Sequence, residues 1–159
     1  MKNIYYKSTI IAIAILTIVF SAWFYEKKFS KEASGDFVKN LTVFIDDTKI
    51  NANVAQTNEE RIRGLSGRLI LSKSSGLFFI FNTTDYHGIW MKEMLFPIDI
   101  IWIDESYRIV DIKENVDPSS YPKVFTPQTK ARYVLEVNAG FVKTHGVKVG
   151  DYIVKKQSA

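Results

Sequence analysis

Short apolar runs alternate with polar turns along the chain from residue 41 onward, a pattern typical of a β domain. The runs are rich in Val, Ile, Phe, Tyr and Trp, which suit a pleated, half-buried surface. Residues 115–127 hold three of the four prolines and are predicted to be a loop. Strands are predicted at residues 41–45, 49–55, 76–81, 89–94, 98–104, 108–113, 131–137 and 151–155. We therefore expect a mainly β fold, a compact sandwich or barrel of about seven to eight short strands.

Two short helices are expected between these strands. Thr57 and Glu60 have the spacing of a capping box, in which each residue satisfies a backbone amide of the other. A helix is therefore predicted from Thr57 to about Arg63, and Gly64 is well placed to end it. Residues 139–144 are expected to form the second short helix or a turn.

Residues 1–28 have a different pattern. Lys2 and Lys7 precede the uncharged run Ser8–Tyr25, which is just long enough to cross a bilayer core of ~30 Å at ~1.5 Å per residue. We expect a transmembrane helix that anchors a periplasmic or extracellular domain; a cleaved signal peptide and a buried soluble helix are the alternatives. The expected organisation then continues with a linker at 29–40, the β domain at 41–155 and a tail at 156–159.

The sequence pI of about 9.2 overstates the positive charge of the expected domain. Residues 1–28 contain four Lys and one Glu, which is +3 of the formal net charge of +4, so residues 29–159 carry only +1. This domain has no basic block, which argues against electrostatically driven nucleic-acid binding. The chain contains no cysteine, which excludes disulfides, thiolate catalysis and cysteine-ligated metal sites.

Two charged residues lie in the most apolar part of the chain, residues 90–104. Lys92 lies between Met91 and Met94, and Asp99 lies on a predicted strand whose two faces are otherwise apolar. A charge removed from water is costly unless it is paired or hydrogen-bonded. Asp99 is therefore expected to be a structural carboxylate, bonded to a backbone turn or to a cation, or else an acid that lines a pocket. Lys92 either reaches solvent or meets Asp99 at the mouth of a cleft.

Further polar and aromatic residues suggest a ligand site. Arg61 and Arg63 lie about 200° apart on the predicted helix, so one of them is expected to face inward and bind a carboxylate. Trp90 is expected to be partly exposed and to stack on a ligand. Glu136 and Asp99 are the acids that could serve a hydrolase.

Metal binding has little support, because the two histidines, His87 and His145, are far apart in the sequence. No Gly-x-Ser-x-Gly elbow is present for nucleophilic catalysis. No metal, cofactor or catalytic residue is therefore expected.

Several short blocks, taken in their order along the chain, resemble the DUF192 family, also called UPF0127. The blocks are residues 57–68, 76–81, 90–92, 97–104, 135–140 and 150–151. The resemblance covers about residues 41–155 and implies a compact mainly β fold, commonly behind a signal sequence or anchor. It also implies a common cleft lined by Arg61, Arg68, Trp90, Met91, Lys92, Asp99 and Glu136. The chain departs from the family pattern at Ser66, Glu93 and Met94, where Met, Asn and Thr are usual.

These observations favour a non-catalytic, membrane-tethered domain that binds a small ligand or a cell-envelope component. An acid/base hydrolase that uses Asp99 or Glu136 is one alternative, and an accessory subunit of an envelope complex is the other. The membrane is an expected partner through the N-terminal helix, and nucleic acid is not.

Overall fold

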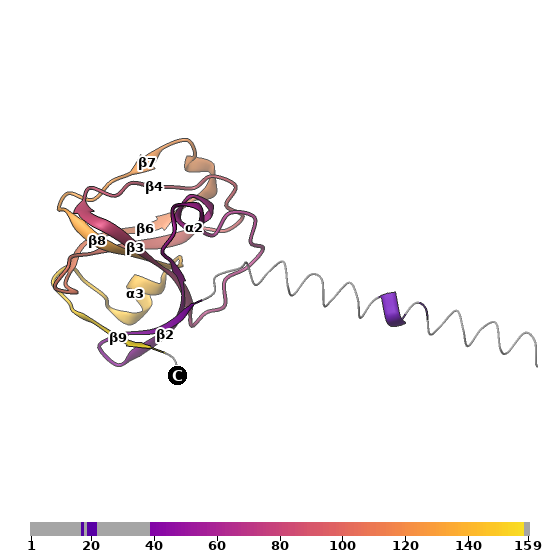
Figure 1. Ribbon diagram of the computed structural model, residues 1–159, viewed down its shortest axis with the longest axis horizontal. Helices are drawn as coiled ribbons and strands as arrows, with labels where there is room; N and C mark the ends of the chain where they lie inside the picture. Colours follow the sequence, from indigo (N-terminus) through magenta and orange to yellow (C-terminus); the bar gives the residue numbers. More distant parts are fainter. Residues whose placement is uncertain (1–16, 18, 22–38, 158–159) are drawn as a thin grey trace, which may run out of the picture. The chain divides into compact units, whose positions relative to one another are not determined.

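The computed structural model describes residues 17, 19–21 and 39–157, and the fold below is that of residues 39–157. In chain order its elements are β1 (Asn40–Ile45), β2 (Thr48–Ala55), α2 (Asn58–Arg63), β3 (Ser75–Asp85), β4 (Ile89–Trp90), β5 (Ile98–Ile103), β6 (Ile109–Val116), η1 (Pro118–Ser120), β7 (Val124–Phe125), β8 (Ala131–Asn138), α3 (Phe141–His145) and β9 (Ile153–Gln157). Seven strands form one sheet in the order β6-β5-β8-β3-β2-β1-β9, and β4 pairs with β7 in a separate ribbon (Figure 1). The predicted mainly β class is confirmed.

Neighbouring strands of the large sheet pair antiparallel, with one exception. Strands β2 and β3 run parallel, from the Asn51–Ser75 pair to the Ala55–Phe79 pair. Two parallel strands need a crossover connection, which returns the chain to the end of the sheet where the first strand begins. The segment that contains α2 provides this crossover. This crossover places α2 and the loop after it beside the sheet.

The start of α2 confirms the predicted capping box. The Thr57 hydroxyl accepts a hydrogen bond from the backbone amide of Glu60 at 3.2 Å, and the Glu60 carboxylate accepts one from the amide of Thr57 at 2.8 Å. The backbone amides of Thr57 and Gln56, which both donate to the Glu60 carboxylate, lower the pKa of Glu60. The helix ends at Gly64, whose φ of 51° suits a residue without a Cβ atom.

The sheet curls until its two edge strands meet at one corner. Arg108, just before β6, forms an isolated antiparallel bridge with Tyr152, just before β9. The amide of Ile109 donates to the carbonyl of Asp151 at 2.8 Å. The predicted sandwich or barrel is therefore observed as a half-barrel made from a single curled sheet.

Each face of the sheet has its own apolar core. All seven strands contribute to the inner core, where Phe141 and Val142 of α3 pack against them. The outer core lies between the central strands and a cover that includes Leu65, Ile89, Met91 and Met94. Along β5, Ile100 and Trp102 belong to the outer core and Ile101 and Ile103 to the inner one, as the alternation of a strand requires.

Three details differ from the sequence-based expectation. The strand predicted at 89–94 is only two residues long, because the chain turns after Trp90 with the Met94 amide donating to the Met91 carbonyl. The loop predicted at 115–127 contains η1 and β7. Residues 39–157 therefore hold three short helices in place of two.

The predicted transmembrane helix and linker lie largely outside the described residues. Within the part that the structure describes, no helix is both long enough and apolar enough to span a membrane.

Candidate functional site

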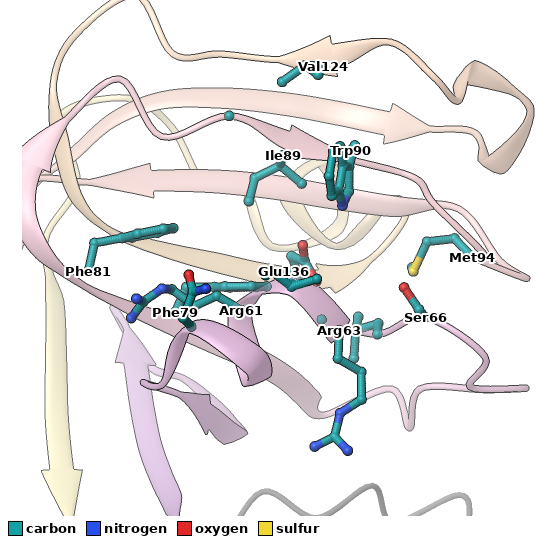
Figure 2. Close-up of a pocket in the computed structure, with 15 residues that line it drawn as sticks. Arg61, Arg63, Ser66, Phe79, Phe81, Ile89, Trp90, Met94, Val124 and Glu136 are labelled. Carbon is teal, nitrogen blue, oxygen red and sulfur yellow. The ribbon is translucent and has the colours of Figure 1, made fainter.

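A pocket of about 290 Å³ opens on the outer face of the sheet, close to the lower size limit of small-molecule sites, ~300 Å³ (Figure 2). The sheet supplies its floor, the α2 segment one wall and the β4–β7 ribbon the opposite wall. Its lining is mainly apolar and comprises Asn58, Arg61, Ile62, Arg63, Gly64, Leu65, Ser66, Phe79, Phe81, Gly88, Ile89, Trp90, Met94, Val124 and Glu136.

Glu136 of β8 is the acid among these lining residues. Pairing across the sheet places it between Leu77 of β3 and Ile100 of β5, so its immediate neighbours are apolar. The residue is 4% exposed, and its Oε2 atom has no hydrogen-bond partner in the described part of the chain. Burial raises the pKa of Glu136 to about 8, an effect that the positive charge of Arg68 opposes. The carboxyl group therefore keeps its proton through most of the neutral range.

Arg61 is held in place at the wall of the pocket. Its Nη1 atom donates to the backbone carbonyls of Gln56 and Ile80, the latter at 2.9 Å. The guanidinium lies over the Phe81 ring, 5.3 Å from its centroid, a geometry that favours a cation. The predicted inward-facing arginine is thus Arg61, although it binds carbonyls and not a carboxylate. Arg63 extends away from Glu136 (Figure 2).

The wall formed by the ribbon depends on a close approach at Gly88. A Cβ atom at this position would lie 2.5 Å from Cγ1 of Val124. Such a contact is too short to exist, so a larger residue at this position would force the Val124 side chain or the ribbon to shift. Trp90, 44% exposed, and Val124, 49% exposed, then stand at the opening of the pocket. The predicted partial exposure of Trp90 is confirmed.

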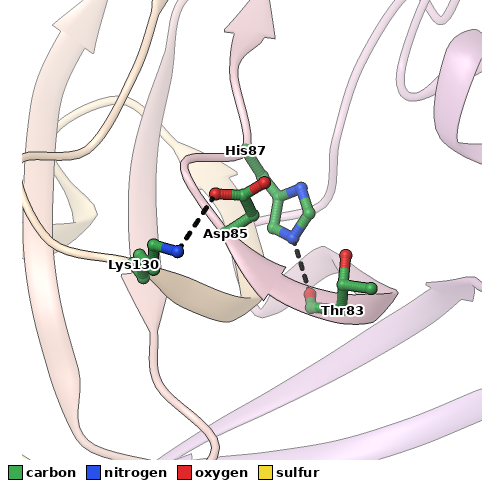
Figure 3. A network of polar contacts seen from close by, with 4 residues as sticks. All are labelled: Thr83, Asp85, His87 and Lys130. Carbon is green, nitrogen blue, oxygen red and sulfur yellow. Dashed lines mark hydrogen bonds and ion pairs between the residues drawn. The ribbon is translucent and has the colours of Figure 1, made fainter.

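His87 supports the pocket without lining it. Its ring stacks on Phe81 with centroids 3.6 Å apart, and its Nε2 atom lies 2.8 Å from the carbonyl of Thr83 (Figure 3). An exposed ion pair nearby joins Asp85 to Lys130 at 3.8 Å (Figure 3). Such a surface pair contributes little to stability. The stacking on Phe81 and the contact with the Thr83 carbonyl hold the turn before β4 in place, so the role of the His87 imidazole is structural.

Asp99 points to the other face of the sheet from Glu136. It pairs with Val137, the next residue along β8, and therefore faces the inner core. Asp99 is fully buried, and its two oxygens accept hydrogen bonds from the backbone amides of Asn115 (2.8 Å), Gly140 (3.2 Å) and Val142 (2.9 Å). This is the structural carboxylate that was one of the two expectations. It anchors α3 and the end of β6.

Lys92 does not meet Asp99, so the proposed pairing is wrong. Asp99 is fully buried with backbone partners, whereas Lys92 is exposed on the turn after β4. The backbone carbonyl of Lys92 accepts a hydrogen bond from the Ser66 hydroxyl at 2.7 Å and so helps to hold the pocket wall. The lysine is exposed because β4 ends at Trp90 and the chain leaves the sheet.

The remaining two candidates, Met91 and Arg68, are not part of the pocket lining. Met91 is 1% exposed and packs in the outer core. Arg68 is half-buried, its Nη1 atom donates to Oδ1 of Asn53 at 3.3 Å, and its charge acts on Glu136. Of the seven predicted site residues, the structure thus places three in the pocket lining (Arg61, Trp90 and Glu136), one close to Glu136 (Arg68), and three elsewhere (Met91, Lys92 and Asp99).

Sequence reasoning missed the apolar lining of the pocket. Phe79, Ile89, Met94 and Val124 carry no signal that separates a pocket wall from a core, because both require the same residue types. Gly88 carried a faint signal, since a glycine directly before an apolar strand indicates a turn or a close approach of the backbone.

The polar side chains of the pocket lining are one acid (Glu136), one hydroxyl (Ser66), one amide (Asn58), the Trp90 indole and the guanidinium groups of Arg61 and Arg63. Asp99 and Glu136 cannot flank a single bond, because they lie on opposite faces of the sheet, so a hydrolase that uses both is excluded. The Ser66 hydroxyl donates to a carbonyl and has no histidine beside it in the pocket lining. Residues 39–157 contain no cluster of His, Cys, Asp and Glu that could hold a metal ion.

Comparison with known proteins identifies the family. The DUF192 family, described as an uncharacterized ACR, matches residues 41–154. A UPF0127 protein of Thermococcus kodakarensis is 33% identical over 118 residues, covering 70% of this chain and 71% of that protein. A second UPF0127 protein, from Thermococcus gammatolerans, is 33% identical over 105 residues, and the match spans 65% of each chain.

Two solved structures share the fold. A proposed transcription regulator from Sinorhizobium meliloti 1021 has a TM-score of 0.68 and 28% identity over 74% of this chain and 92% of its own. A protein of unknown function from Novosphingobium aromaticivorans has a TM-score of 0.67 and 27% identity, covering 72% of this chain and 83% of its own. The order of the motif blocks, the match over the β domain and these relatives agree, and the chain belongs to the DUF192 (UPF0127) family of uncharacterised proteins.

Proposed function

We propose that this domain binds a small molecule in the pocket above Glu136, without catalysing a reaction. The observation that carries the proposal is the Oε2 atom of Glu136, which is buried and lacks a hydrogen-bond partner within the described residues. A buried polar atom without a partner costs about 1–3 kcal/mol of folding free energy. An apolar residue would avoid that cost, so the carboxyl group is best explained by a ligand that completes its hydrogen bonding.

The lining of the pocket supports a ligand with an apolar body. Phe79, Phe81, Ile89 and Trp90 offer aromatic and aliphatic surface, and polar groups are few. This combination is typical of sites that bury a small organic molecule and orient it through one or two polar contacts.

Binding is favoured over hydrolysis because a single carboxyl group faces the pocket. A glycosidase needs two carboxyl groups about 5–9 Å apart on either side of the bond that it cleaves. Ser66, whose hydroxyl donates to the carbonyl of Lys92, has no adjacent general base in the pocket lining. Glu136 acting alone with an ordered water would be the remaining hydrolytic form, and turnover of any ligand found to bind would reveal it.

We further propose that residues 1–28 tether the domain outside the cytoplasm. The support is the uncharged run Ser8–Tyr25 between basic flanks. Protease added to spheroplasts, whose cytoplasmic membrane is intact and exposed, should release the domain, while a chain lacking residues 1–28 should stay inside. Protection of the full chain in spheroplasts would contradict the tethering and leave the binding proposal standing.

Binding can be tested with a matched pair of exposed valine variants. Val124→Trp should fill the opening of the pocket, whereas Val154→Trp on β9, at a residue that is 55% exposed, adds the same bulk away from the pocket. A library of small apolar acids, amines and alcohols is screened against the full chain by NMR. Ligands should shift resonances of the pocket lining in the native chain and in Val154→Trp, and lose affinity at least tenfold in Val124→Trp. Equal affinity in both variants, or no ligand at all, would refute the proposed site.

A further inference from the structure

The charges around the pocket indicate what kind of polar group it receives. The ionisable residues of the lining are Arg61, Arg63 and Glu136, and Arg68 lies close enough to act on Glu136. The sheet neighbours of Glu136, Leu77 and Ile100, carry no charge. A carboxyl group buried among apolar side chains favours its neutral form. With Glu136 neutral, the nearby guanidinium groups give the pocket a positive potential, which attracts anions and repels cations.

The neutral form of Glu136 also sets the direction of its hydrogen bonds. A protonated carboxyl group donates through its O–H and accepts through its carbonyl oxygen. The buried Oε2 atom has no partner within the described residues, and Glu136 belongs to the pocket lining, so its carboxyl group has unused hydrogen-bonding capacity at the pocket floor. A ligand that brings an anionic acceptor would form an O–H···O⁻ bond, which is among the shortest and strongest hydrogen bonds in proteins.

We propose that the pocket binds a monocarboxylate with an apolar body, whose carboxylate accepts a hydrogen bond from Glu136 in the field of Arg61 and Arg68. The inference rests on the proposed binding function and names the ligand class of the same site. The apolar body lies against Phe79, Phe81 and Trp90, and the buried position of Glu136 keeps water from the shared proton. Arg61 already uses Nη1 for the carbonyls of Gln56 and Ile80, so it contributes mainly through its charge.

Three probes with one apolar body distinguish this class from its alternatives: 3-phenylpropanoate, 3-phenylpropylammonium and 3-phenylpropanol. Their affinities for the full chain are measured by calorimetry at pH 7 and pH 9, a range in which neither charged probe changes its own charge. The propanoate should bind at least tenfold more tightly than the other two at pH 7. Its affinity should fall about tenfold at pH 9, because Glu136, with a pKa of about 8, has lost its proton there.

Two variants separate hydrogen bonding at Glu136 from its structural role. Glu136→Gln keeps an N–H donor, so propanoate binding should persist and lose its dependence on pH. Glu136→Leu keeps the bulk and removes the donor, so propanoate affinity should fall at least tenfold. Thermal unfolding of both variants checks that they fold.

The outcomes divide cleanly between the two proposals. Preference for the ammonium probe, with affinity rising toward pH 9, would overturn the carboxylate inference and leave the binding function intact. Equal affinity for all three probes, or Glu136→Leu binding like the native chain, would also overturn it. The binding function itself would be overturned if no probe and no library compound showed binding that Val124→Trp weakens.

Discussion

Replacing Glu136 with Gln should raise the stability of the domain by an amount that grows with pH. In the unfolded chain the carboxyl group has its ordinary pKa near 4.5, whereas burial raises the pKa to about 8 in the folded state. Between these values the folded state binds the extra proton, so the free energy of unfolding falls as pH rises, at about 1.4 kcal/mol per pH unit. The destabilisation that results from ionising the buried Glu136 is therefore absent below pH 4.5 and reaches its full size above pH 8.

The size of the effect follows from the same two pKa values. The destabilisation from ionisable Glu136 is about 1 kcal/mol at pH 5, about 3 kcal/mol at pH 7 and about 5 kcal/mol at pH 9. Glutamine has nearly the same shape and does not titrate. The difference in unfolding free energy between Glu136→Gln and the native chain should therefore increase by about 4 kcal/mol from pH 5 to pH 9.

Urea unfolding at pH 5, 7 and 9 measures this difference, with fluorescence of the buried Trp102 as the signal. Glu114→Gln, which removes an exposed carboxylate from β6, serves as the control and should follow the native chain closely. If the stabilities of the native and Glu136→Gln chains change in parallel with pH, the claim that burial raises the pKa of Glu136 is refuted. A binding monocarboxylate should stabilise the native chain most at low pH, when Glu136 holds its proton.

Two further predictions concern the scaffold that holds the pocket. Asp99→Ala should destabilise the chain by about 4 kcal/mol, because three backbone amides, one buried and two partly buried, lose their acceptor, whereas Asp47→Ala in an exposed turn should change stability by less than ~0.5 kcal/mol. Equal urea midpoints for these two variants would contradict the anchoring role of Asp99. Thr57→Ala should cost about 1 kcal/mol through the lost cap of α2 and Thr57→Ser much less; a serine variant as unstable as the alanine variant would argue against the cap.

Local rules were sufficient wherever a few adjacent residues decide the outcome. Short runs of β-branched and aromatic residues predicted β5 and β8, and the spacing of Thr57 and Glu60 predicted the start of α2. The cost of burying a charge identified Asp99 as a residue that must have partners. This argument could not identify the partners, because the amides of Asn115, Gly140 and Val142 come from segments far from Asp99 in the sequence.

The sequence by itself determined the β class and most of the strands, because the apolar runs and the turn residues between them act over short distances. Only the tertiary structure decided which acid lines the pocket. Asp99 pairs with Val137 and Ile100 with Glu136, so the register of β5 against β8 sends the two carboxyl groups to opposite faces of one sheet. Register depends on contacts between distant segments, and a shift of one residue would exchange the two faces. The physical difference between an anchor for α3 and the floor of a pocket is therefore a property of the folded chain.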